Sequence, residues 1–477
     1  VTQNENTTKN DTDTIITNRE EGASSHTVTI DAKDKDDKVE VTLKDVNIDT
    51  SKQSKAAVSV TGSGDTTIEL DGDNKLKSGS AHAGLEHNKT DTSGELTIQD
   101  NDKNGSLKAA GGQYGAGIGG AGVNDAQVKI TGGKITATGG EYGAGIGGGF
   151  KGSGDVTISG GEIHANGGNY GAGIGGGDYS SGKVTISGGE INATGGYLGA
   201  GIGGGEKGRG DVTITGGEIT SATGGKYGAG IGGGKEGRGD VTIEGNTEVN
   251  AAGGAGGAGI GGGYVAKNNS NQITIKSNEN GSPTVNAVGG SRDKTTKFGG
   301  AGIGAGGDST ATTDITLEGK VTINATAGKD NAAIGANGIE QEFPGLAGGT
   351  SITRKDSDKN DISPLPGDNV PDTDTPSGGG STGGDSTGGD SAGGDSAGGG
   401  SSGGGSADAS VQESVFPGLV VTDKDGQRIS YTSIRDNNVL SLRVGRFTAS
   451  LRASLSTLRQ LRAEGIDTIT FQTILCS

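Results

Sequence analysis

Short hydrophobic segments recur along the chain at a nearly constant spacing. The string Gly-Ala-Gly-Ile repeats many times, and its first five spacings are 28, 28, 28, 29 and 29 residues. We call this series the first ladder; its isoleucines are Ile118, Ile146, Ile174, Ile202, Ile231, Ile260 and Ile303, with a degenerate copy at Ile334. A self-similar period of this length is typical of solenoids, propellers and repeat arrays.

Two further series share this period. The second ladder has the form Val-Thr-Ile and consists of Ile130, Ile158, Ile186, Ile214, Ile243 and Ile275, followed by Leu317. The third ladder consists of Ile135, Ile163, Ile191, Ile219, Val249 and Val285, and then Val321 or Ile323. In both series apolar and polar residues alternate with period two between glycines, which favours strands over helices.

These three ladders predict an all-β fold, a single-stranded parallel β-helix solenoid with about 28 residues per coil. Propeller blades need about 40 residues and four strands, so they fit less well. Each coil would lay three short strands on the coil below. Valine and isoleucine would point inward, while the intervening threonines, such as Thr157, would point outward.

Composition divides the chain into four predicted regions. Residues 1–23 read as a flexible lead-in or cap, and residues 24–350 as the β-helix. Residues 351–410, with prolines and then a Gly/Ser/Asp-rich tract, read as a flexible linker. Residues 411–477 read as a small α+β module, which is short enough to be a truncated part of a larger domain.

Within that last module the pattern predicts strands, a turn and one helix. The strands are expected at 418–422, 428–433, 439–444 and 466–471, with a hairpin turn at Asp425-Gly426. The helix is expected to present Leu451, Leu455, Leu458 and Leu461 on one face and to end at Gly465.

The composition narrows the function. With 103 glycines and a hydrophobic fraction of 28%, the chain cannot build a large core, so its apolar burial must come from many small repeated contacts. A net charge of −18 argues against a nucleic-acid partner. No apolar run of ~18 residues exists, so no membrane span is expected. Because methionine is absent, position 1 included, we expect a processed or excised chain, which fits removal of a secretory signal.

Tyrosines recur within the repeat. Tyr114, Tyr142, Tyr170 and Tyr227 are in register, with Leu198 at the equivalent position and Tyr197 beside it. Because the residue before each tyrosine varies freely, that residue is expected to face solvent and the tyrosine to face inward, as a core ladder. If the ladder is instead exposed, Tyr114, Tyr142, Tyr170, Tyr197 and Tyr227 would bind a glycan by stacking against sugar rings.

A column of glutamates precedes the third ladder. Its members are Glu162, Glu190, Glu218 and Glu248. The favoured interpretation is a solvated, screened surface. The alternative is that Ca²⁺ bridges them, since hard cations prefer carboxylate oxygens.

Catalysis is not expected. The acidic residues recur along the repeat, whereas an active site should interrupt it with unique residues. The insertion between Ile260 and Ile303 is the first place to search for such a site, because it contains Arg292, Lys294 and Lys297. Two Arg-Gly-Asp tripeptides, at 209–211 and 238–240, match the sequence that integrins read, but repeat drift also explains them.

The repeat resembles known glycine-rich repeats. Residues 154–163 and 167–177 are similar to repeats in secreted or cell-surface proteins of gut Firmicutes. Residues 41–48 and 96–100 resemble β-helical domains labelled carbohydrate-binding in such proteins. The resemblance implies a secreted or bacterial cell-surface location and a glycan or host-surface ligand. We therefore expect a non-enzymatic binding protein or adhesin. A passive spacer or matrix protein, or a polysaccharide-degrading β-helix enzyme, are the alternatives.

Overall fold

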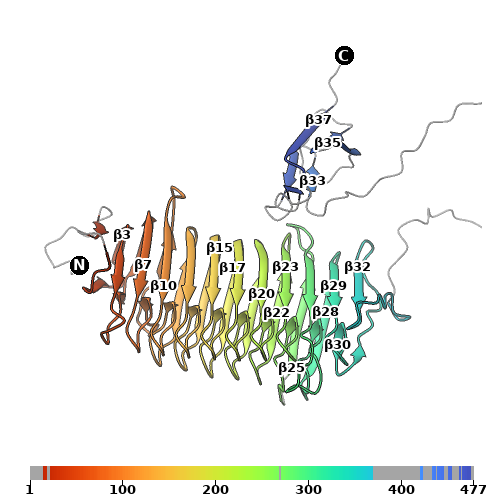
Figure 1. Cartoon of the computed structure of the whole chain (residues 1–477), viewed down its shortest axis with the longest axis horizontal. Coiled ribbons are helices and arrows are strands. Elements are labelled where there is room, and N and C mark those ends of the chain that lie inside the picture. Colours follow the sequence, from red (N-terminus) through yellow and green to blue (C-terminus); the bar gives the residue numbers. More distant parts are fainter. Residues whose placement is uncertain are drawn as a thin grey trace, which may run out of the picture. The chain divides into compact units, whose positions relative to one another are not determined.

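The computed structural model describes residues 14–18, 22–267 and 270–368, together with short segments between 419 and 473. The chain divides into two units, Val1–Pro376 and Ser377–Ser477. The first unit is a stack of parallel coils, drawn from red to teal in Figure 1. The all-β parallel solenoid predicted from the periodicity is therefore confirmed.

Each of the three predicted ladders is a parallel β-sheet. Neighbouring copies pair in register, so that Ile118 pairs with Ile146 and Ile130 with Ile158. Among the described residues, each ladder contains eleven parallel strands. The first-ladder strands are β2 (Val28–Ala32), β5 (Val58–Gly62), β8 (Leu85–His87), β11 (Ile118–Gly119), β14 (Ile146–Gly147), β16 (Ile174–Gly175), β18 (Ile202–Gly203), β21 (Ile231–Gly232), β24 (Ile260–Gly261), β27 (Ile303–Gly304) and β30 (Ile334–Ala336).

The second and third ladders merge where one long strand crosses both, in β15 (Gly154–Asn166) and β17 (Gly182–Thr194). The other second-ladder strands are β1 (Thr14–Thr17), β3 (Lys38–Lys44), β6 (Asp65–Asp71), β9 (Leu96–Gln99), β12 (Ala126–Ile130), β19 (Gly210–Ile214), β22 (Gly239–Glu244), β25 (Ser270–Lys276) and β28 (Thr312–Glu318). The other third-ladder strands are β4 (Asn47–Asp49), β7 (Asp73–Lys77), β10 (Ser106–Ala110), β13 (Lys134–Thr138), β20 (Glu218–Thr223), β23 (Glu248–Ala252), β26 (Thr284–Val288), β29 (Thr322–Thr326) and β32 (Ser351–Lys355).

The core follows the period-two alternation. Val156 and Ile158 are fully buried, while Thr157 between them is half-buried on the outer face. The same inward positions in all coils form one continuous hydrophobic cluster from Ile30 to Leu346. Few apolar side chains per coil suffice because each packs against its copies in the coils before and after it.

Glycine is required where the first ladder turns. The residue after each ladder isoleucine has positive φ, for example +130° at Gly175. A Cβ on Gly175 would also overlap the carbonyl oxygen of Gly203 in the next coil. Any side chain here would therefore both strain the backbone and separate the coils.

The solenoid extends beyond the predicted bounds of 24–350. Strand β1 pairs with β3 before residue 24, and β32 pairs with β29 after residue 350, where the predicted linker begins. A short antiparallel strand, β31 (Ile339–Glu340), follows β30. The fully buried Arg354 pairs with Asp368 and lies 5.6 Å from the ring centroid of Phe343, a member of the core cluster. Residues 369–418, most of the predicted linker, lie outside the described residues.

The second unit contains small sheets. Strand β33 (Leu419–Thr422) is antiparallel to β36 (Ser450–Ala453), and β34 (Thr432–Asp436), β35 (Val439–Val444) and β37 (Thr468–Thr473) form a second sheet. The expected helix does not begin at Leu451, because this residue pairs with Val421 in a sheet. Leu461 and Arg462 are helical, while Leu455, Leu458 and the expected turn at Asp425-Gly426 lie outside the described residues.

Candidate functional site

The turns on either side of each first-ladder strand meet along one edge of the solenoid. The amide of Phe150 donates to the carbonyl of Tyr114, and the amide of Asp178 to that of Tyr142. We call this edge the ridge; it comprises residues 111–125, 139–153, 167–181, 195–209, 224–238, 253–267 and 289–308. Two columns of side chains therefore run side by side along it, one before and one after each first-ladder strand.

The upstream part of the ridge, residues 111–125, 139–153 and 167–181, contains a stack of aromatic rings. The ring centroids of Tyr114 and Tyr142 lie 5.2 Å apart, and those of Tyr142 and Tyr170 lie 5.0 Å apart, with interplanar angles of 9° and 10°. Phe150 packs edge-on against Tyr114 and Tyr142. These tyrosines are half-buried and lie outside the hydrophobic core, so the expected core ladder is wrong.

The stack also does not fit the alternative that all of these tyrosines bind a glycan through open ring faces. Because the rings lie nearly parallel at van der Waals distance, each inner ring has its faces covered by its neighbours. The stack therefore offers ring edges and hydroxyl groups to solvent. Burial, followed by the charge of Glu141, raises the pKa of Tyr142.

Two other tyrosines are more open. Tyr179 is 52% exposed and Tyr197 is 50% exposed. The ammonium group of Lys207 lies 4.6 Å from the ring centroid of Tyr179, and that of Lys226 lies 5.6 Å from that of Tyr197. In the Tyr197 coil the stacking position is held by Leu198, which is buried, and the column of stacked rings therefore stops after Tyr170.

The downstream part of the ridge, residues 195–209, 224–238, 253–267 and 289–308, combines aromatic and charged side chains. Tyr227 packs edge-on against Tyr197 at 5.4 Å and stacks on Tyr264 at 5.3 Å. Its hydroxyl lies 2.7 Å from Oγ1 of Thr295, and hydrogen bonding with Thr295 lowers the pKa of Tyr227. By contrast, burial and a hydrogen bond to Asp308 raise the pKa of Tyr264 to about 12.

A buried acidic pair lies between these two parts. Asp178 and Glu206 follow Phe150 in the same column, and their side chains are almost completely buried. One carboxylate oxygen of Asp178, Oδ1, has no hydrogen-bond partner. Burial, followed by the charge of Glu206, raises the pKa of Asp178 to about 6. Glu206 is 3.4 Å from the ammonium group of Lys235. Sequence reasoning missed this pair because each residue occurs once in a column that varies freely.

The predicted glutamate column lies on the outer face of the third ladder. Glu162 pairs with Lys134 at 2.9 Å and with His164 at 3.0 Å, and these hydrogen bonds lower its pKa. Glu190 is in register between Glu162 and Glu218, and Glu248 follows Glu218. The described structure does not bring three of these carboxylates together around one point.

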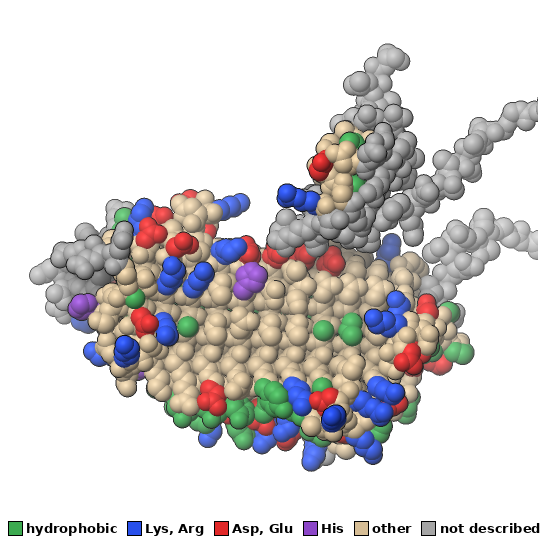
Figure 2. Space-filling model, in the orientation of Figure 1, with side chains coloured by type: hydrophobic (Ala, Val, Ile, Leu, Met, Phe, Trp, Pro, Cys, Tyr) green, Lys and Arg blue, Asp and Glu red, His purple; other side chains and the backbone are tan. Residues whose placement is uncertain are grey.

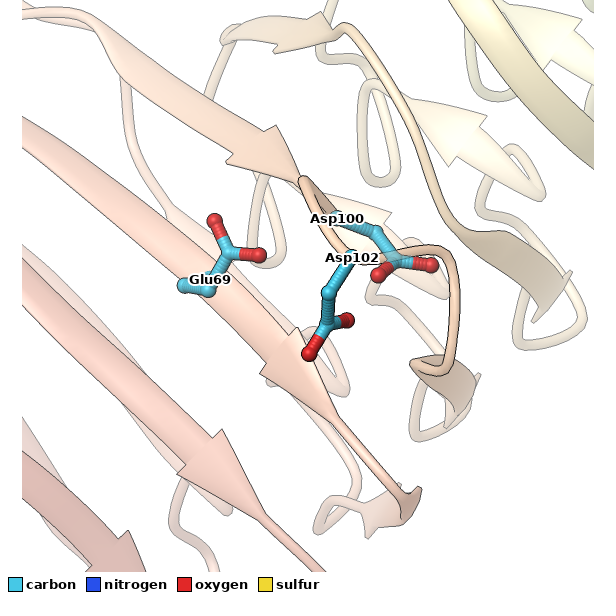
Figure 3. Close-up of side chains that lie close together, drawn as sticks. All are labelled: Glu69, Asp100 and Asp102. Atoms are coloured by element: carbon cyan, nitrogen blue, oxygen red, sulfur yellow. The ribbon is translucent and has the colours of Figure 1, made fainter.

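A different acidic cluster does have metal-like geometry. Oxygen atoms of Glu69, Asp100 and Asp102 lie within 4.8 Å of one another, the only such group among the described residues. Figure 3 shows Glu69 on β6 beside the loop that carries both aspartates. Oxygen donors of this kind suit a hard cation such as Ca²⁺. The sequence signal was Asp-x-Asp-x-Asn-Gly at 100–105, the start of a calcium-loop pattern, which sequence reasoning overlooked.

In both Arg-Gly-Asp tripeptides the glycine is the first residue of a second-ladder strand. Gly210 and Gly239 begin β19 and β22 and pair with each other. Arg209 forms an ion pair with Asp240 of the following coil and lies 3.8 Å from Asp211. The arginine and aspartate side chains are thus engaged with each other within the lattice.

Five consecutive segments match the family model described as beta helix repeat. They are residues 128–150, 156–178, 184–206, 212–235 and 241–264. This part of the chain consists of β-helix repeats. The matched segments include Tyr142, Phe150 and Tyr170 of the aromatic stack and both residues of the acidic pair, whereas Tyr114 precedes them.

Comparison with curated proteins and with solved structures found no significant match. Within its described residues, the structure contains no helix that is long and apolar enough to cross a bilayer. Figure 2 shows one broad solenoid face with few charged side chains, and an edge where hydrophobic and charged side chains gather. Any assignment of function therefore depends on the chemistry of these surfaces.

Proposed function

We propose that this protein is a non-catalytic binding protein whose ridge presents aromatic side chains to a glycan. The observation that carries the proposal is the half-exposure of Tyr179 and Tyr197 on consecutive coils of a rigid scaffold. Exposed tyrosines offer a large apolar face and a polar hydroxyl, and they lose little conformational entropy on binding. The same proposal places the protein outside the cell or at its surface, where such a ligand is accessible.

The exposed rings serve this role better than the stack does. In the stack, Tyr142 has neighbours on both faces, whereas Tyr179 and Tyr197 lie outside it. The predicted ligand-binding set thus separates into two groups. Tyr197 contributes directly to binding, while Tyr114, Tyr142 and Tyr170 hold the ridge in shape, and Tyr227 supports Tyr197 from one side.

A degrading enzyme is the less favoured alternative. Glycoside hydrolysis needs two carboxyl groups that reach the substrate. Asp178 and Glu206 are adjacent and chemically unlike the rest of the repeat, yet they are 2% and 7% exposed. Glu206 is also engaged by Lys235. A passive spacer is the other alternative, and it requires no defined surface at all.

The test is a glycan array with the full chain, followed by affinity measurement on the glycans that bind. Tyr179→Ala combined with Tyr197→Ala should weaken binding by about tenfold or more, since each ring supplies up to about 1.5 kcal/mol of contact energy. Val288→Ala is the matched control, because Val288 is also about half-exposed (47%) but lies at the end of β26 in the third ladder. It should bind like the parent chain.

Two results would overturn the proposal. A chain that binds no glycan on the array would favour the passive spacer. Release of reducing ends or unsaturated sugars from a bound polysaccharide, abolished by Asp178→Asn, would favour the enzyme.

A further inference from the structure

The insertion between β24 and β27 folds onto the downstream ridge. Asp293 forms an ion pair with Lys226 at 2.9 Å, and hydrogen bonds from Thr295 and Lys226 lower the pKa of Asp293. The hydroxyl oxygen of Tyr264 lies 3.4 Å from the backbone carbonyl oxygen of Thr295. These contacts hold the insertion against the rings of Tyr227 and Tyr264 and fix where its remaining charged side chains lie.

The downstream ridge is basic, although the whole chain is acidic. Its segments 195–209, 224–238, 253–267 and 289–308 contain nine Lys and Arg against four Asp and Glu, a net charge of +5. The upstream segments 111–125, 139–153 and 167–181 contain one Lys against three Asp and Glu, a net charge of −2. Since the net charge of the chain is −18, the downstream ridge is a local positive surface on a strongly negative protein.

Several of these cations are available to a ligand. Lys207, Lys267, Lys294 and Lys297 form no ion pair with any residue that the structure describes. Lys294 and Lys297 are exposed on the insertion. Lys297 lies 5.0 Å from the ring centroid of Phe298, as Lys207 does at 4.6 Å from that of Tyr179. Two of these lysines therefore lie beside an aromatic ring.

We propose that the downstream ridge binds an acidic polysaccharide, a linear glycan that carries carboxylate or sulfate groups. This inference rests on the proposed glycan function and specifies its ligand. Each of the four downstream segments carries at least one cation, and successive coils lie about 4.8 Å apart, so a polyanion lying along the ridge would meet a cation in every coil. The rings between them would contact the sugar units. The acidic remainder of the surface disfavours a long nucleic acid.

The experiment compares two forms of one polymer. Polygalacturonate carries a carboxylate on each unit, and its methyl-esterified form has the same backbone with the charge removed. The full chain should bind polygalacturonate about tenfold or more tightly than the ester at low salt, and the difference should shrink as salt screens the charges. Lys294→Gln with Lys297→Gln should weaken binding about threefold to tenfold.

The matched control removes the same charge elsewhere. Lys52→Gln with Lys55→Gln changes two exposed lysines far along the solenoid and should leave binding unchanged. Equal binding of both polymers would overturn the acidic ligand and leave the glycan function intact. Three other results would also overturn the inference: an equal loss of affinity in both lysine variants, no binding of either polymer, or tighter binding of a single-stranded DNA than of polygalacturonate. If polygalacturonate binds and the tyrosine double variant binds it equally well, the proposed aromatic site fails instead.

Discussion

The upstream and downstream parts of the ridge share one backbone lattice but use their aromatic residues differently. Upstream, Tyr114, Tyr142 and Tyr170 stack on one another, and Phe150 packs against their edges. Downstream, the stacked column is interrupted by Leu198, and Tyr197 is half-exposed. Tyr179, in the last upstream segment, is half-exposed as well, so the open rings lie where the two parts of the ridge meet.

Charge follows the same division. The upstream segments have a net charge of −2 and the downstream segments +5. The buried Asp178 and Glu206 lie where one part gives way to the other. A lattice fixed by inward isoleucines and turn glycines leaves the ridge positions free to vary. Stability and recognition can therefore be assigned to different coils of one solenoid.

The largest expected effect concerns the lattice itself, which both parts share. Gly147→Ala upstream and Gly232→Ala downstream each place a side chain at positive φ and against a carbonyl of the next coil. Each should lower the free energy of unfolding by about 3–5 kcal/mol, measured by chemical denaturation. Gly345→Ala is the control, because its φ is +81° but its space is open, and about 1 kcal/mol is expected. Unequal losses at Gly147 and Gly232 would show that the two parts do not share one lattice.

The next effect separates the two kinds of ring. Tyr142→Ala removes contacts with three other rings and should cost about 2–3 kcal/mol of unfolding free energy. Tyr197→Ala should cost less than about 1 kcal/mol, because half of its surface is already exposed. The measurement is again equilibrium denaturation. Equal costs would mean that the upstream stack contributes nothing beyond its buried area.

The fold was predictable because its cause is periodic. Inward isoleucines such as Ile158 recur at one spacing, and only stacked coils bury all of them. The orientation of the tyrosines was not predictable from alternation. Tyr142 lies in a turn, where its amide donates to the carbonyl of Gln113 and period two does not hold. The ring of Tyr142 therefore stacks outside the core, and the preceding Glu141 is half-buried like the ring itself.

The candidate site was predictable only in part. Tyr197 was among the tyrosines predicted to bind a glycan if exposed, and the insertion was singled out only as the first place to search for an active site. Asp178 was missed because its importance depends on burial, which follows from the meeting of two turns. Glu69 and Asp102 come from neighbouring coils, so they meet only because of how one coil is aligned on the next. Asp102 lies in a loop, where the strand pattern of the sequence does not specify this alignment.

A smaller effect tests the acidic pair between the two parts. The pKa of Asp178 is raised to about 6, so its carboxylate destabilises the folded state above pH 6 and this penalty disappears as the pH falls toward the ordinary value of 3.8. Asp178→Asn should therefore stabilise the chain at pH 8 by about 2 kcal/mol and have no effect near pH 3.5. Val123→Ala, which removes an exposed upstream side chain without a charge, should change the stability equally at both pH values. A gain independent of pH would exclude the buried charge as its cause.

The smallest expected effect compares the tyrosine hydroxyls. The pKa of Tyr142 upstream is raised by burial, whereas that of Tyr227 downstream is lowered, with the hydrogen bond to Thr295 as the first cause. Spectroscopic titration of the parent chain against Tyr227→Phe and Tyr142→Phe should therefore show that Tyr227 ionises first. Thr295→Val removes the hydroxyl partner and should raise the pKa of Tyr227. If Tyr142 ionises before Tyr227, or if Thr295→Val leaves the titration unchanged, the insertion does not hold the downstream rings in the way its contacts indicate.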